Sequence, residues 1–267
     1  MEALANTNRG RLLDEQLRRA VQVLKMASRV VVLTGAGVSK ESGIPTFRDA
    51  QTGLWAQYDP AQLATTEAFR RDPKLVWDFY EFRREIMRPA QPNPAHTALA
   101  ELERRLPDLK LITQNVDDLH ERAGSANVIR LHGQIHQNRC FSSCQDYPTV
   151  VDVSQLEWDR AKGPPACPHC GAPVRPDVVW FGEMLPSDAL MAAQEASRTA
   201  DVMLIVGTSG LVSPAADLPY LAKKRGAALF EFNPVPSALT SIVDLHFAEQ
   251  AGVALPRLVQ ALDHEEG

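Results

Sequence analysis

Residues 30–48 of this 267-residue chain read VVVLTGAGVSKESGIPTFR, and the rest of the sequence can be interpreted outward from them. Residues 30–33 are branched and apolar, which is typical of a strand buried on both faces of a parallel sheet. Gly35 and Gly37 then allow a tight turn in which the backbone can approach a ligand, because glycine has no Cβ. A turn from strand to helix often binds phosphate, since helix N–H groups and the helix dipole favour an anion.

The glycine pair alone does not decide between a plain tight turn and a nucleotide site. Lys40 stands where the dinucleotide fingerprint has its third glycine. Residues 43–48 favour the nucleotide site, because a proline turn there would bring an aromatic ring and a guanidinium to the phosphates. Arg48 has the shape that suits pyrophosphate, and Phe47 can shield a reactive ring from water.

The segments GAGVS (35–39), SGIP (42–45) and FR (47–48) resemble the signature of the sirtuins, which are NAD-dependent protein deacylases. The resemblance covers nearly the whole chain. It implies that NAD is the co-substrate and that this stretch contacts it through Gly35, Ala36, Gly37, Ser39, Pro45, Phe47 and Arg48.

Composition and charge exclude several classes of protein. The chain is 45% hydrophobic and 23% charged, as an ordinary globular protein is. Its net charge is −5 without a block of like charge, so we expect no direct nucleic-acid binding. The first ten residues are polar and the longest apolar runs, such as 202–206, are too short to cross a membrane. We therefore expect a cytoplasmic protein without a membrane partner.

Strand-like and helix-like segments alternate along most of the chain. Strands are expected at 30–33, 109–113, 128–133, 201–206, 227–232 and 243–247, and helices at 13–26, 96–106, 187–198, 214–225 and 253–262. This alternation predicts an α/β fold, with a Rossmann-like parallel sheet covered by helices on both faces. We assign 1–48, 94–133 and 178–267 to a discontinuous NAD-binding domain, 49–93 to a helical insertion with one helix at 73–87, and 134–177 to a zinc-binding module of the zinc-ribbon type.

The four cysteines, Cys140, Cys144, Cys167 and Cys170, all lie in that last module. In a reducing compartment such clustering indicates a metal site rather than disulfides. Two close pairs of thiolates can close a tetrahedron around one structural Zn²⁺. Sirtuins usually have two residues between the first pair, whereas this chain has three. Cys144 is therefore open to question as a ligand, with His136 and His169 as the alternatives.

Polar residues follow the strand expected at 109–113, where the ligand crevice of an open α/β sheet lies. The resemblance implies that Gln114, Asn115 and Asp117 bind the nicotinamide ribose and amide, with Asn115 also catalytic. It makes His132 the general base, a role that suits a group titrating near neutral pH. Chain position alone would also fit a hydrogen-bonded structural histidine, and His120 is the competing imidazole.

The later motifs complete the expected sites. The resemblance implies that NAD also contacts Gly207, Thr208, Ser209, Asn233 and Ala251. Residues 178–183 resemble the segment beside which a sirtuin's substrate peptide adds as a strand, which would make Val179, Phe181 and Gly182 substrate contacts. The plainer interpretation, an ordinary apolar strand, leaves the trailing Phe-Gly-Glu unexplained.

Tyr80 and Arg83 lie three residues apart in the expected helix 73–87, so their side chains can share one face. From the sequence alone, a core tyrosine beside a solvated arginine fits equally. The Tyr-x-x-Arg pattern, together with Ala64, resembles class III sirtuins, which remove succinyl, malonyl and glutaryl groups. Bacterial members with this motif are commonly also deacetylases.

The resemblance therefore implies an enzyme that removes succinyl or malonyl groups, and also acetyl groups, from lysine side chains of proteins or peptides. Its products would be nicotinamide and 2′-O-acyl-ADP-ribose. The alternatives are a mono-ADP-ribosyltransferase on the same fold and a non-catalytic NAD- or zinc-dependent interaction module.

Overall fold

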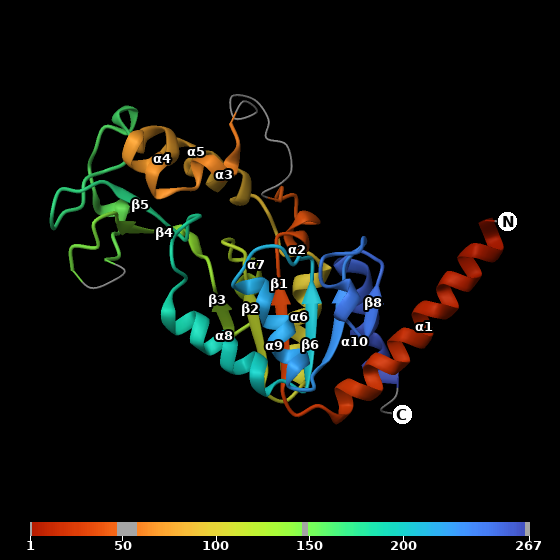
Figure 1. The fold of residues 1–267 in the computed structure, drawn as a ribbon. Coiled ribbons are helices and arrows are strands. Elements are labelled where there is room, and N and C mark those ends of the chain that lie inside the picture. The colour runs from red at the N-terminus through yellow and green to blue at the C-terminus, as the bar shows by residue number, and fades with distance from the viewer. Residues whose placement is uncertain (1, 47–57, 146–148, 265–267) are drawn as a thin grey trace.

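A computed structural model describes residues 2–46, 58–145 and 149–264 (Figure 1). Its main sheet has six strands in the order β3-β2-β1-β6-β7-β8, and every neighbouring pair is parallel. The strands are β1 (Val30–Thr34), β2 (Leu109–Thr113), β3 (Val128–Arg130), β6 (Val202–Val206), β7 (Ala228–Phe232) and β8 (Leu245–Phe247). This is the strand order of the dinucleotide-binding folds, and it confirms the predicted fold class.

Helices cover both faces of this sheet, because alternate residues of each strand point to opposite sides (Figure 1). Val30 and Val32 of β1 pack in one apolar cluster, whereas Val31 and Leu33 pack in the other. The first cluster is covered by α1 (Glu2–Met26), α6 (Pro94–Arg105) and α10 (Ala251–His264), and the second by α8 (Ser187–Thr199) and α9 (Leu218–Lys224). Helix α1 begins well before the predicted residue 13, and the predicted helix 214–225 is divided into a short 3₁₀ turn, Ala215–Asp217, and α9.

A smaller part lies beyond the carboxyl ends of the parallel strands (Figure 1). It contains α3 (Pro60–Leu63), α4 (Thr66–Arg71), α5 (Pro73–Met87) and an antiparallel pair formed by β4 (Gly133–Cys140) and β5 (Val174–Val178). Helix α5 has the predicted bounds because Asp72 caps it, accepting a hydrogen bond from the N–H of Leu75 at 2.9 Å, and Pro73 occupies its first turn. Phe69, Phe79 and Trp180 belong to the apolar cluster that joins these helices to the two strands.

Two features of this smaller part were not assigned from the sequence. Residues 134–177 were assigned to a zinc-binding module without bounds for its strands, and β4 and β5 pair at the two ends of that segment. An ordinary apolar strand was the plainer alternative for residues 178–183, but β5 ends at Val178 and is followed by an isolated bridge between Phe181 and Thr65. Both features depend on contacts between segments that are distant in the sequence.

Short helices complete the described structure: α2 (Gly37–Lys40), α7 (Leu119–Arg122), and 3₁₀ turns at Val153–Gln155, Arg160–Lys162 and Thr240–Ile242. Among the described residues, no helix combines the length and the apolar character needed to cross a membrane.

Candidate active site

The loops that follow β1, β2, β6 and β7 meet at the carboxyl edge of the sheet. The N–H of Gly37 donates to the carbonyl oxygen of Gly207 at 2.8 Å. Thr208 accepts one hydrogen bond from the side-chain amide of Gln114 at its hydroxyl, 3.1 Å, and one from that of Asn233 at its carbonyl, 3.1 Å. Strand order reverses between β1 and β6, and ligands of open α/β sheets bind at such a switch point. Four segments predicted to bind the cofactor therefore lie together.

The glycines of this turn are required first by the protein itself. A Cβ on Gly37 would lie 2.6 Å from the carbonyl oxygen of Gly207, and one on Gly35 would lie 2.8 Å from the Cβ of Thr208. The loop after β1 and the loop after β6 are thus so close at Gly35 and Gly37 that neither position has room for a side chain. Helix α2 is a single turn, so its N–H groups rather than a long helix dipole would attract an anion. Phe47 and Arg48, which the sequence placed next to this turn, lie outside the described residues.

Ser39 joins the loop after β1 to the loop after β2 through buried hydrogen bonds. Its hydroxyl donates to Oδ2 of Asp117 at 2.9 Å and accepts from the side-chain amide of Asn115 at 3.1 Å. The backbone N–H of Asn115 donates to the hydroxyl of Thr113 at 3.0 Å, and that of Leu119 donates to Oδ1 of Asp117 at 3.1 Å. Burial raises the pKa of Asp117, and the hydrogen bonds from Leu119 and Ser39 oppose the rise. The side chains predicted to bind ribose and amide are therefore held in fixed orientations.

Two buried histidines, His96 and His120, lie close to Ser39 and to Thr34 at the end of β1. His96 Nε2 is 3.5 Å from the hydroxyl of Ser39, and His120 Nε2 is 3.0 Å from the hydroxyl of Thr34. The centroids of the two rings are 4.9 Å apart. Burial lowers the pKa of His96 to about 4 and that of His120 well below its ordinary value, so both rings are neutral at neutral pH. Sequence reasoning missed His96; the available signal was its place three residues after Asn93, where it completes the capping box of α6.

His132 follows β3 and faces the loop after β2. Its Nδ1 lies 2.8 Å from the carbonyl oxygen of Gln114. A carbonyl oxygen can only accept, so Nδ1 carries the hydrogen and the lone pair of the neutral ring is on Nε2. Burial lowers the pKa of His132, with the hydrogen bond to Gln114 opposing, so Nε2 can accept a proton at neutral pH.

Residues 179–182 connect His132 with the helical part. The N–H of Val179 donates to the carbonyl oxygen of His132 at 3.0 Å, and the N–H of Phe181 donates to that of Ala64 at 2.9 Å. Gly182 then turns the chain with a φ of 84°, a conformation that favours glycine. The residues predicted to contact the substrate peptide are therefore adjacent to the predicted base.

Tyr80 of α5 lies in the apolar cluster with Phe79, as the core interpretation of the sequence held, and its hydroxyl accepts a hydrogen bond from the indole N–H of Trp180 at 2.9 Å. Burial raises the pKa of Tyr80 to about 12. Arg83 is half-buried, with its guanidinium 5.9 Å from the centroid of the Phe79 ring, so it is not the solvated side chain of the alternative interpretation. Burial lowers the pKa of Arg83, whereas Tyr80 and Asp117 oppose the change.

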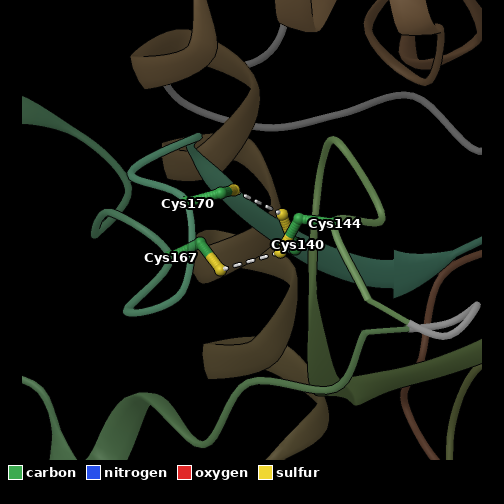
Figure 2. A group of neighbouring side chains, drawn as sticks. All are labelled: Cys140, Cys144, Cys167 and Cys170. Carbon is green, nitrogen blue, oxygen red and sulfur yellow. Dashed lines mark hydrogen bonds between the residues drawn. The ribbon is translucent and has the colours of Figure 1, made fainter.

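The side chains of the four cysteines point toward one another (Figure 2), with Cys140 at the end of β4 and the other three between β4 and β5 in the sequence. Their sulfur atoms lie within 4.8 Å of one another, with Cys140 and Cys170 at 3.5 Å and Cys144 and Cys167 at 3.8 Å. A zinc ion with Zn–S bonds of about 2.3 Å at the centre of a tetrahedron requires S–S separations of about 3.8 Å. The cluster is therefore compatible with one structural zinc and four protein ligands.

Cys144 reaches this cluster despite the extra residue before it. Ser143 adopts a φ of 46°, a left-handed turn that takes up the additional length. His136 and His169, the alternative ligands, are exposed and lie outside the group of four sulfur atoms. The geometry thus favours the four-cysteine set.

Comparison with known proteins identifies the family. The sequence pattern described as the Sir2 family matches residues 35–214. An NAD-dependent protein deacylase from Pyrococcus furiosus is 49% identical over 241 residues, covering 90% of this chain and 96% of that protein. NAD-dependent protein deacylase 1 from Pseudomonas aeruginosa is 51% identical over 245 residues, covering 91% of this chain and 98% of that protein.

Solved structures agree with this result. A Sir2 homologue in complex with NAD superposes with a TM-score of 0.84 at 45% identity, covering 93% of this chain and 94% of that one. A Sir2 protein bound to acetylated peptide superposes with a TM-score of 0.79 at 31% identity, covering 91% of this chain and 97% of that one. The sequence resemblance is confirmed, and this chain belongs to the Sir2 family.

Proposed function

We propose that the chain is an NAD-dependent protein-lysine deacylase that removes acetyl, succinyl and malonyl groups, releasing nicotinamide and 2′-O-acyl-ADP-ribose. The observation that carries the proposal is the placement of His132. Its Nδ1 is held by Gln114, which leaves Nε2 as a neutral base at the crevice of the sheet. Homologues named as NAD-dependent protein deacylases, and a Sir2 homologue in complex with 2′-O-acetyl ADP ribose, support the same reaction.

The donor set of the crevice fits NAD as co-substrate. Hydroxyl, amide and carboxylate groups at Ser39, Asn115 and Asp117 suit a ribose and a carboxamide, which need both donors and acceptors. We assign the binding of NAD to these three residues and to Gly35, Ala36, Gly37, Pro45, Gln114, Gly207, Thr208, Ser209, Asn233 and Ala251. Phe47 and Arg48 belong to the same proposed site and lie outside the described residues. His132 would accept a proton through Nε2, and Asn115 would keep the reacting groups in place.

The zinc site has a structural role in this proposal. Four thiolates from Cys140, Cys144, Cys167 and Cys170 fill a tetrahedron and leave no position for substrate. The metal would hold β4 and β5 together, because the apolar cluster beside it is small. We further propose that the chain divides into the NAD-binding domain, the helical insertion and the zinc-binding module, that it is located in the cytoplasm, and that it does not bind nucleic acid.

Acyl selectivity is assigned to Tyr80, Arg83 and Ala64. An arginine can bind the distal carboxylate of a succinyl or malonyl group with two parallel hydrogen bonds, and a tyrosine hydroxyl can add a third. Ala64 is small and fully buried beside residues 179–182, which leaves space for the longer acyl chain. An acetyl group lacks the carboxylate, so it would use the same base without these contacts.

The products separate this function from its alternatives. Full-length protein is incubated with NAD and with succinyl-, malonyl-, acetyl- and unmodified lysine peptides, and peptide mass is measured. We expect the acylated peptides to lose the acyl mass and the unmodified peptide to stay unchanged. A gain of the mass of ADP-ribose would instead identify a mono-ADP-ribosyltransferase, and unchanged masses would identify a non-catalytic module.

A further inference from the structure

The indole of Trp180 is the hydrogen-bond donor to Tyr80. Its N–H lies 2.9 Å from the phenol oxygen, across 100 residues of chain. Trp180 and Tyr80 are each 2% exposed, so water does not compete for this contact. An indole N–H can only donate. The oxygen of Tyr80 must therefore act as the acceptor.

This contact restricts the direction of the phenol hydrogen. Because a lone pair of the oxygen faces Trp180, the O–H of Tyr80 has to point away from the indole. Within residues 2–46, 58–145 and 149–264, no group accepts that hydrogen. A buried donor without an acceptor is unfavourable, and a ligand that supplies an acceptor relieves that cost. The arrangement therefore selects a ligand with an oxygen acceptor beside Tyr80.

Trp180 is itself held rigidly from the other side. The guanidinium carbon of Arg175 lies 3.2 Å from the centroid of the Trp180 ring. Arg175, which is 1% exposed, donates to both carboxylate oxygens of Glu183, at 2.5 and 2.9 Å. Glu183 also accepts the backbone N–H of Trp180 at 2.8 Å. Both the backbone and the ring of Trp180 are thus fixed by β5 and by the turn that follows it.

We propose that Trp180 is a positioning residue for acyl selectivity: it holds the oxygen of Tyr80 as an acceptor and so directs the Tyr80 O–H to the distal carboxylate of a succinyl- or malonyl-lysine beside Arg83. The inference rests on the proposed function, in which Tyr80 and Arg83 bind that carboxylate. An acetyl group offers no such acceptor. Its removal should therefore not depend on the indole N–H.

Two substitutions at position 180 test this role. Trp180→Phe keeps an aromatic ring against Arg175 and removes the N–H, and β-(3-benzothienyl)alanine at position 180 removes the N–H while keeping the shape of the indole. We expect the KM for a succinyl-lysine peptide to rise about tenfold, the loss of one hydrogen bond, with kcat changed less than about twofold. KM and kcat for the acetyl-lysine peptide should stay within about twofold of the wild-type values.

Trp158→Phe is the matched control. The indole N–H of Trp158 donates to the carbonyl oxygen of Gly163 at 3.1 Å. This is also an indole hydrogen bond to oxygen, and it lies in the chain segment between Cys144 and Cys167. Its loss should leave the ratio of succinyl to acetyl activity unchanged. If the Phe variant does not fold, which absent acetyl turnover would reveal, the benzothienyl variant carries the test.

A double-mutant cycle shows whether Trp180 acts through Tyr80. In a Tyr80→Phe background, Trp180→Phe should not raise the succinyl KM further. An equal rise with and without the Tyr80 hydroxyl, or an equal rise for succinyl and acetyl peptides, would overturn the inference. The inference would also be overturned if wild type and Trp180→Phe processed the succinyl peptide with the same KM and kcat. Wild-type protein without succinyl turnover would overturn the proposed acyl selectivity itself, and the inference with it.

Discussion

Gln114 fixes the tautomer of His132: its carbonyl oxygen accepts the Nδ1 hydrogen at 2.8 Å, which leaves Nε2 as the free base. The contact joins the loop after β2 to the loop after β3, so the predicted base is positioned at the carboxyl edge of the sheet. Removing the imidazole should therefore affect the reaction more than the binding of the co-substrate.

We expect His132→Ala to lower kcat by about 10²- to 10⁴-fold, the usual contribution of a general base. The dissociation constant for NAD, measured by calorimetry, should change only a few-fold because its other contacts remain. His136→Ala is the control, since His136 is an exposed histidine in the neighbouring strand β4 and should be replaceable without loss. Equal losses in the two variants would contradict the assignment of the base.

The buried histidine beneath Ser39 predicts how stability depends on pH. His96 is fully buried and its pKa falls from 6.5 to about 4, so below pH 6.5 the unfolded chain binds a proton that the folded chain does not. The contribution of neutral His96 to the free energy of unfolding is therefore fully present above pH 6.5, and it is lost as the pH falls from 6.5 toward 4. At pH 5 the loss should reach about 2 kcal/mol.

Urea unfolding of wild type and His96→Gln at neutral pH and at about pH 5 measures this effect. Glutamine does not titrate, so the free energy of unfolding of the variant should fall less on acidification. Only the difference between the two pH values counts, because the substitution can change stability at every pH. The same pH dependence in both proteins would exclude His96 as its source.

Arg83→Met should remove desuccinylation and spare part of the deacetylation. Methionine keeps much of the length of the side chain but cannot bind a carboxylate, so only substrates with a distal carboxylate lose a contact. We expect a loss of at least about 100-fold in kcat/KM for succinyl peptide, as expected for a carboxylate that loses a paired arginine. Arg88→Met, at the exposed end of the same helix, is the control. An equal loss for both substrates would refute the assignment of the pocket.

Local signals explain which elements could be predicted from the sequence. Strand β1 follows from a run of branched apolar residues, and α5 follows from the Asp72-Pro73 cap. The parallel sheet with helices on both faces follows from their alternation. These features depend on neighbouring residues, and the structure confirms them.

Contacts between distant segments explain what could not be predicted. Strand β4 has the sequence GQIHQNRC, in which little apolar alternation marks a strand; its pairing with β5 and the cysteine cluster hold it. The Tyr80–Trp180 hydrogen bond and the approach of His96 to Ser39 arise only when the fold brings those residues together. The fit of Cys144 depends on the left-handed φ of Ser143, which the spacing of the cysteines does not reveal.

Removal of zinc should unfold the smaller part before the sheet. The apolar cluster at the cysteines is small, so the metal would supply much of the stability of this region. We expect about one zinc per chain by elemental analysis. A strong chelator should abolish deacylation together with protease resistance near residues 140–170. Full activity of zinc-free protein would contradict a structural role for the metal.

The most direct test of the proposed function is whether nicotinamide release depends on an acyl-lysine peptide. Nicotinamide and deacylated peptide are quantified over time with NAD and either acyl or unmodified peptide. We predict equal molar amounts of the two products with the acyl peptide, and nicotinamide at the background rate with the unmodified one. Nicotinamide released at the same rate without an acyl group would contradict the assignment of this chain as a protein-lysine deacylase.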